Sequence, residues 1–178
     1  RACLLLSVAL PLAFATGAAD TPQPGLGVLF AGLFALHATR LVLWHDRGLW
    51  RVPLLWSLHL AYAWMAAACL GMALWHAGVA VNLSLVTHAL TIGAMTGLIV
   101  AMMARVSLGH TGRPLKVPNR VVGAFVLLQL AALARVVLTL FTPLGVSLSV
   151  LCWSLALLLF LWHYLPILLR PRVDGMPG

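Results

Sequence analysis

Long apolar runs alternate with short polar gaps along the whole chain. A hydrocarbon core of about 30 Å needs roughly 20 apolar residues in a helix to cross it. The gaps contain proline and glycine, which end helices. The runs predict helices at about 2–19, 25–44, 53–75, 84–104, 118–141 and 145–168. The pattern therefore predicts an all-α fold, a polytopic membrane bundle that forms one region of six transmembrane helices.

The composition excludes a water-soluble domain. Of the 178 residues, 63% are hydrophobic and 8% are charged, whereas soluble domains carry about 25% charged residues. The net charge of +8 does not indicate nucleic acid, because the basic residues lie in gaps between apolar runs and are not gathered on one exposed face. The expected partner is the lipid bilayer, and no nucleic-acid partner is expected.

The basic residues predict the orientation of the helices. Lys and Arg flank the second and fourth gaps and follow the last helix, and the first, third and fifth gaps carry none. Basic loops stay in the cytoplasm, so the N-terminus, these two loops and the C-terminus are predicted to be cytoplasmic. The residues on which this rests are Arg40, Arg47, Arg51, Arg105, Arg113, Lys116, Arg120, Arg170 and Arg172.

The start of the chain has two interpretations. It opens at Arg1 and enters an apolar run directly. This indicates the C-terminal half of a longer polypeptide, whose N-terminal half would be a partner. The alternative is a signal peptide, because the apolar stretch after Arg1 is followed by small residues up to Ala19.

Seven histidines are the main candidates for chemistry in so apolar a chain. Ionisable groups at membrane depth are costly, and they mark bundle interiors, cofactors or ion paths. His59 and His88 are the first candidates for ligands, followed by His37 within its helix and by His110, which we expect in the loop after 84–104. His59 also begins a stripe of small residues at four-residue spacing that suits either another helix or the flat face of a porphyrin; the others are Ala63, Ala67 and Gly71.

The helix predicted at 84–104 carries two further patterns. His88, Met95 and Met102 are spaced by seven residues, so an imidazole and two thioethers share one face of an α-helix, a ligand set suited to copper or haem. Methionines on helices also serve as core filler. The pair Gly93 and Gly97 forms a GxxxG step, which predicts a close contact with another helix.

Two basic features suggest anion binding. Arg135 lies inside a predicted helix near Gln129, and we expect its guanidinium either to reach the membrane surface or to pair with an anion such as a haem propionate. The loop at 105–114 combines two glycines with His110 and Arg113, which predicts an anion or cofactor-edge site. The alternative for this loop is a plain basic loop at the membrane surface.

Residues 88–95, continuing into 102–115 with the motif Gly109-His110-Thr111-Gly112-Arg113, closely resemble the signature of the NnrS family. Residues 53–64 and 164–178 are also similar to that family. The resemblance implies a bacterial inner-membrane protein that contains haem b and copper and responds to nitric oxide in denitrification and nitrosative stress. From this resemblance together with the positions described above, we expect His59, His88, His37, His110 and Arg113 to bind haem, and His59, His88, Met95 and Met102 to bind metal.

The order Thr96-Gly97 departs from the family pattern, and His163 falls at a variable position of the terminal motif. No acid–base pair in the sequence indicates catalytic turnover, so whether the protein is an enzyme stays open. Two other functions stay open as well. One is a b-type cytochrome that carries electrons between quinol and a partner. The other is half of a non-haem transporter, in which histidines and Arg135 line an ion path.

Overall fold

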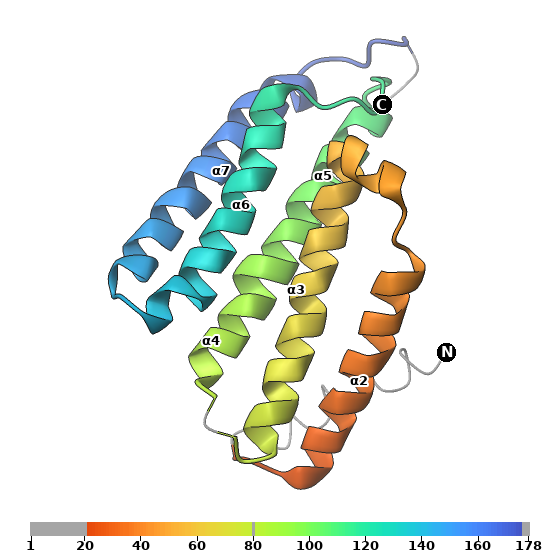
Figure 1. The fold of residues 1–178 in the computed structure, drawn as a ribbon. Helices are drawn as coiled ribbons and strands as arrows, with labels where there is room; N and C mark the ends of the chain where they lie inside the picture. The colour runs from red at the N-terminus through yellow and green to blue at the C-terminus, as the bar shows by residue number, and fades with distance from the viewer. Residues whose placement is uncertain (1–20, 80, 176–178) are drawn as a thin grey trace.

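The computed structural model describes residues 21–79 and 81–175, and its regular elements are helices (Figure 1). Five of them are long and apolar enough to cross a membrane. An all-helical, membrane-like bundle is therefore confirmed. The run predicted at 2–19 lies outside the described residues. The spans cover Pro24–Leu43, Pro53–His76, Leu83–His110, Asn119–Leu140 and Leu144–Leu168.

The spans follow one another up and down through the bundle (Figure 1). Short helical segments join or interrupt them. The elements in chain order are α2 (Pro24–Leu43), η1 (Arg47–Arg51), α3 (Pro53–His76), α4 (Leu83–His88), the π-helical η2 (Ala89–Thr96), α5 (Gly97–His110), α6 (Asn119–Val136), η3 (Leu138–Leu140) and α7 (Leu144–Leu168).

The helix ends follow local chemistry. α2 and α3 both begin with proline, whose fixed φ suits the first helical position and whose missing N–H is not needed there. Asn82 begins α4 by accepting a hydrogen bond from the Ser84 backbone N–H at 2.9 Å. The chain leaves α5 through Gly112 at φ 72°, a left-handed conformation that favours glycine.

The third described span differs from its prediction in two ways. The helix continues through residues 105–110, so the expectation of a loop that starts at Arg105 is wrong. Ser107 and Leu108 are buried in this added segment, and the first strong break is at Gly112. The span also contains the π-helical η2, which a simple apolar pattern does not indicate.

Small residues bring the central helices close together. α3 packs against α5 and η2, and α6 pairs with α7. A Cβ added to Gly93 would lie 2.5 Å from Trp64 Cγ, and one added to Gly97 would lie 2.8 Å from Ala61 Cβ. The close helix contact predicted from the GxxxG step is therefore confirmed, with α3 as its partner.

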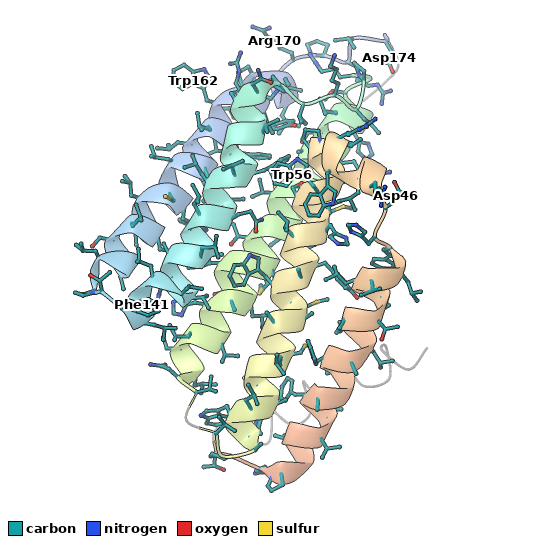
Figure 2. The ribbon with its side chains drawn as sticks, in the orientation of Figure 1. Asp46, Trp56, Phe141, Trp162, Arg170 and Asp174 are labelled. Atoms are coloured by element: carbon teal, nitrogen blue, oxygen red, sulfur yellow. The ribbon has the colours of Figure 1, made fainter. Side chains whose placement is uncertain are left out.

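The basic residues collect at one end of the bundle. This basic end carries η1, the loop between α5 and α6, and the C-terminal segment; Asp46, Arg170 and Asp174 lie there, and Phe141 lies at the opposite end (Figure 2). Among the described Lys and Arg residues, Arg135 is the exception, because it lies near the end of α6 that leads to Phe141. The grouping agrees with the predicted loops, and which end faces the cytoplasm stays a prediction.

Candidate functional site

A cavity of about 460–470 Å³ occurs at each end of the bundle, and the one away from the basic end holds His88. We call it the His88 cavity. It has a volume of 470 Å³ and lies between the α4–η2 segment, α6 and α7. Its walls combine polar and apolar side chains: His88, Thr91, Ile92, Thr96, Arg135, Val146, Ser149, Val150 and Trp153.

His88 presents a nitrogen lone pair. Its Nδ1 lies 2.5 Å from the backbone oxygen of Ser84. A carbonyl oxygen accepts only, so Nδ1 must carry the proton, and in the neutral ring the lone pair is then on Nε2. Metal-ligating histidines are commonly held in this way, with one ring nitrogen donating to a carbonyl and the other free for the metal.

Arg135 lies beside His88. Its Nη2 donates to Ser84 Oγ at 3.1 Å, so Ser84 contacts both basic side chains of the cavity. Within residues 21–79 and 81–175, the ion pair of the structure joins Arg172 and Asp174 at the basic end. The guanidinium of Arg135 therefore has no carboxylate partner among these residues, which favours the expectation that it pairs with a bound anion.

The π-helical segment shapes one wall of the cavity. Thr96 Oγ1 donates to the Thr91 backbone oxygen at 2.9 Å, five residues earlier. Each π turn takes in one more residue than an α turn, so the seven-residue spacing no longer keeps side chains on one face. Met95 and Met102 are 50% and 46% exposed and do not line the His88 cavity. The structure does not bring these two thioethers to His88.

A second group of histidines lies between α2 and α3 at the basic end. The rings of His45 and His59 have centroids 5.8 Å apart, and Trp50 packs against both rings. His37 is buried, and its Nδ1 lies 2.6 Å from the hydroxyl of Tyr62. We call His37, His45 and His59 the α2–α3 histidine group.

His45 was not predicted from the sequence as a partner of His59. The available signal was the short connection between two antiparallel helices, which returns the chain to the same membrane depth. By contrast, His59 and His88 lie near opposite ends of the bundle, with about 20 Å between them along the helix axes. One metal ion bonds nitrogen at about 2 Å, so these two histidines cannot share an ion within this chain.

The stripe of small residues on α3 meets different neighbours along its length. A Cβ added to Gly71 would lie 2.7 Å from Val86 of α4, so helix packing explains that position. Ala63 and Ala67 line an open groove of 320 Å³ against α6. Gln129 of α6 also lines this groove, and its Oε1 accepts a hydrogen bond from Trp64 Nε1 at 2.9 Å. This bond explains how an amide is tolerated at that depth.

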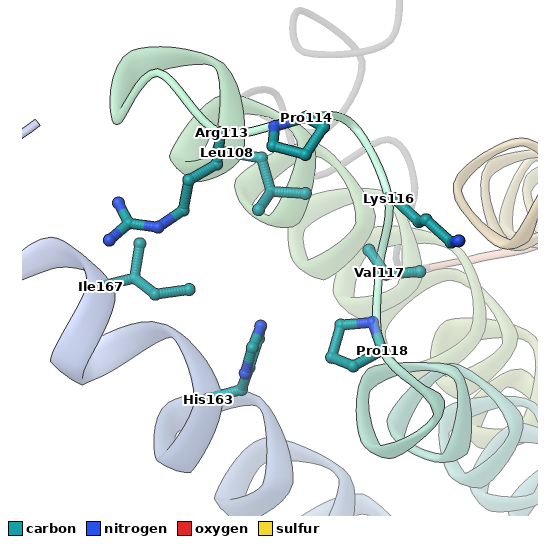
Figure 3. Close-up of a pocket in the computed structure, with 8 residues that line it drawn as sticks. All are labelled: Leu108, Arg113, Pro114, Lys116, Val117, Pro118, His163 and Ile167. Carbon is teal, nitrogen blue, oxygen red and sulfur yellow. The ribbon is translucent and has the colours of Figure 1, made fainter. Parts of the chain in front are cut away.

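The loop between α5 and α6 forms a third candidate site. Arg113 lines a cavity of 460 Å³ together with His163 of α7 (Figure 3). His110 is the exposed last residue of α5 and does not line this cavity. Of the two residues that the sequence groups in this loop, Arg113 therefore lines the cavity and His110 does not, and His163, to which the sequence gave little weight, lines it as well.

The described part of the chain contains no group of three or more His, Cys, Asp or Glu side chains placed to hold a metal ion. A bare metal ion in a structural site usually takes three or four protein ligands. Haem makes a smaller demand, because its iron takes one or two axial ligands from the protein. His88 and the His45–His59 pair can each meet that demand.

Comparison with known proteins identifies a family. The family model described as NnrS protein matches residues 1–172, which is nearly the whole chain. Neither the curated proteins nor the solved structures contain a match. The extent of the family match shows that this chain belongs to the NnrS family.

Proposed function

We propose that this NnrS family member is a haem protein of the bacterial inner membrane that binds nitric oxide and protects against nitrosative stress, with haem b in the His88 cavity. The observation that carries the proposal is the geometry of His88, whose Nδ1 is engaged by the Ser84 carbonyl and whose Nε2 keeps its lone pair. Family membership and the membrane-like bundle support it.

The residues of the His88 cavity fit the chemistry of haem. His88 would supply the axial imidazole, and the Arg135 guanidinium has the planar, charged donors that suit a propionate. Ile92, Val150 and Trp153 give the cavity apolar walls. Its volume of 470 Å³ lies within the usual range of about 300–1,000 Å³ for small-molecule and cofactor sites. The chemistry that haem supplies when bound is coordination of a diatomic molecule at iron.

Arg113 and His110 have no part in this proposed site. They lie at the basic end, about 30 Å from His88 along the α4–η2–α5 span. A propionate of a haem held through His88 cannot reach that far. Arg135, which the sequence also suggests as a partner for a propionate, is the arginine of this proposed site.

Copper is assigned in this proposal to His45 and His59. Imidazole is a good ligand for copper, and the 5.8 Å between the two ring centroids is compatible with two nitrogens directed at one ion. Further ligands for that ion would come from outside the described residues. His37 is less suited, because its Nδ1 is engaged by Tyr62.

A b-type cytochrome is the second candidate function. It is favoured by one observation, namely that His88 and the His45–His59 pair lie near opposite ends of the bundle. Electron transfer between quinol and a partner across the membrane requires haems at two depths. A cytochrome of this kind with both axial positions filled binds nitric oxide poorly, which distinguishes it from the first candidate.

The test is the haem content of the protein purified from membranes. His88→Ala is expected to lose haem, because the iron loses its axial nitrogen. His163→Ala is the matched control, since this histidine also lies on a membrane-spanning helix and lines a cavity of similar volume. In the wild type, nitric oxide should shift the Soret band. His45→Ala and His59→Ala should lower copper content and leave the haem held by His88.

Three results would contradict the proposal. Equal haem content in His88→Ala and His163→Ala, at equal expression, would remove His88 as the ligand. A Soret band that does not respond to nitric oxide would favour the cytochrome. The absence of any Soret band in the wild type would favour a transporter without haem.

A further inference from the structure

We propose that the cavity beside Arg113 and His163 binds the phosphate headgroup of an anionic phospholipid. The cavity has a volume of 460 Å³ and lies at the basic end, between the α5–α6 loop and the last turns of α7. Figure 3 shows the Arg113 and His163 side chains directed into the space between loop and helix; Lys116 also lines the cavity, and its exposed side chain points away from that space. The cavity is distinct from the proposed haem site.

The Arg113 side chain can offer hydrogen-bond donors to a ligand. Its guanidinium makes a hydrogen bond to the Thr111 backbone oxygen at 3.5 Å, a length at which such a bond is weak. A guanidinium carries five N–H donors, and their planar fork matches two oxygens of a phosphate. Arg120 adds a second positive charge near His163. The cavity therefore has a positive potential and a donor set suited to an anion.

The nearest carboxylate is already held by another arginine. Arg172 Nε and Nη2 donate to the two carboxylate oxygens of Asp174 at 2.9 and 2.6 Å. This two-point hydrogen bond raises the pKa of Arg172. Asp174 packs against Gly112, so the pair lies close to the loop and balances its own charge there. Arg113 and Arg120 add two further positive charges at this end of the bundle, so the net charge around the cavity stays positive.

The loop that carries Arg113 is well fixed. The Arg113 backbone N–H donates to the Leu108 oxygen at 2.9 Å, and the buried Thr111 donates through Oγ1 to the Ser107 oxygen at 2.6 Å. The Val173 N–H donates to the Thr111 oxygen at 3.2 Å, which ties the loop to the C-terminal segment. A binding group on a fixed loop loses little conformational entropy on binding, so this loop is prepared for a ligand.

The apolar walls of the cavity point to a lipid as the source of the phosphate. Leu108, Val117 and Ile167 line it alongside the cations. Outside the cavity, α7 exposes Leu165 and Leu168, which are 52% and 53% accessible and lie in its last turn, next to the cavity. A free phosphate uses only the polar part of such a site, whereas a phospholipid uses both parts. Basic pockets between transmembrane helices at a membrane surface commonly bind acidic lipid headgroups.

The experiment measures lipid retention by the delipidated, haem-loaded protein in detergent. Phosphatidylglycerol, phosphatidylcholine and inorganic phosphate are titrated separately, and bound molecules are counted by native mass spectrometry. We expect phosphatidylglycerol to bind and phosphatidylcholine and inorganic phosphate to bind at least about tenfold more weakly.

Arg113→Ala should weaken phosphatidylglycerol binding by about tenfold or more, because it removes a charged two-point contact. Arg170→Ala is the matched control: it removes one exposed positive charge from the same end of the bundle, at a residue that does not line the cavity, and it should change binding by less than about twofold. Arg113→Lys should fall between them, since lysine keeps the charge and loses the fork. Arg113→Gln keeps most of the side-chain volume and provides a second test if the alanine variant folds poorly.

Equal losses in Arg113→Ala and Arg170→Ala would overturn the proposal, because they would indicate a diffuse surface charge. Equal affinity for phosphatidylglycerol and inorganic phosphate would assign the cavity to a free anion. Loss of haem in Arg113→Ala, with lipid binding intact, would assign it to a cofactor edge. Haem content in all variants is recorded alongside, so that failure here is distinguishable from failure of the haem proposal.

Discussion

Gly93→Ala is the change for which the structure gives the sharpest expectation. Gly93 is buried in η2, where the chain contacts Trp64 of α3. A Cβ at this position would lie 2.5 Å from Trp64 Cγ and 2.8 Å from Trp64 Cβ. These separations are far inside ordinary carbon–carbon contact, which is about 3.5–4.0 Å. One of the two helices or the indole ring must move.

The indole ring is not free to move. Trp64 Nε1 donates to Gln129 Oε1 at 2.9 Å, and this bond links α3 to α6. Overpacking of this kind costs about 1–3 kcal/mol. Losing this half-buried hydrogen bond adds about 1 kcal/mol. We therefore expect Gly93→Ala to lower the free energy of unfolding by about 2–4 kcal/mol.

The measurement is thermal unfolding in detergent, followed by circular dichroism. Gly123→Ala in α6 is the matched control, because no heavy atom lies within 4 Å of the added Cβ. It should be neutral or slightly stabilising. Gly93→Ala should also cost less in a Trp64→Leu background, since the clash is then relieved. Equal effects of the two glycine substitutions would refute this account of the α3–η2 contact.

Three further outcomes are expected. The first concerns orientation and uses a variant without native cysteines, to which an impermeant thiol reagent is applied outside the cell. The reagent should label Phe141→Cys, whose position is 81% exposed, and should not label Lys116→Cys. The reverse labelling pattern would invert the predicted orientation. Tyr62→Phe should lower the free energy of unfolding by about 1–3 kcal/mol, because buried His37 loses its partner, and unchanged thermal unfolding would contradict that role. Ser149→Ala should lower the free energy of unfolding by about 1 kcal/mol in the same assay, because Ser149 Oγ donates to the Ala131 oxygen across the α6–α7 contact. Ser147 is exposed, so Ser147→Ala should cause no measurable change.

The fold could be predicted well because a membrane imposes one strong requirement on sequence. A span must be apolar over its whole length, so apolar runs report helices directly, as they do for α3 between Pro53 and His76. The end of α5 was harder to predict. Arg105 is charged but still helical, because a basic residue can sit at the membrane surface without ending a helix.

The candidate site was less predictable, because it depends on contacts between helices. His88 could be selected from the sequence, but its neighbours Ser84 and Arg135 come from a tertiary arrangement and from the phase of a π-helical segment. A seven-residue spacing assumes an unbroken α-helix, and η2 breaks that assumption for Met95. For the same reason, the pairing of His45 with His59 had to be found in the folded structure.

The central claim is that Nε2 of His88 is an axial ligand of haem, and imidazole rescue of His88→Gly tests it most directly. Removing the side chain leaves a space the size of an imidazole beside the Ser84 carbonyl, which can accept the same hydrogen bond from a free imidazole. We predict that His88→Gly purified without imidazole lacks the wild-type Soret band, and that added imidazole together with haem restores it. If His88→Gly keeps its Soret band without imidazole, then another residue holds the iron and the claim is contradicted.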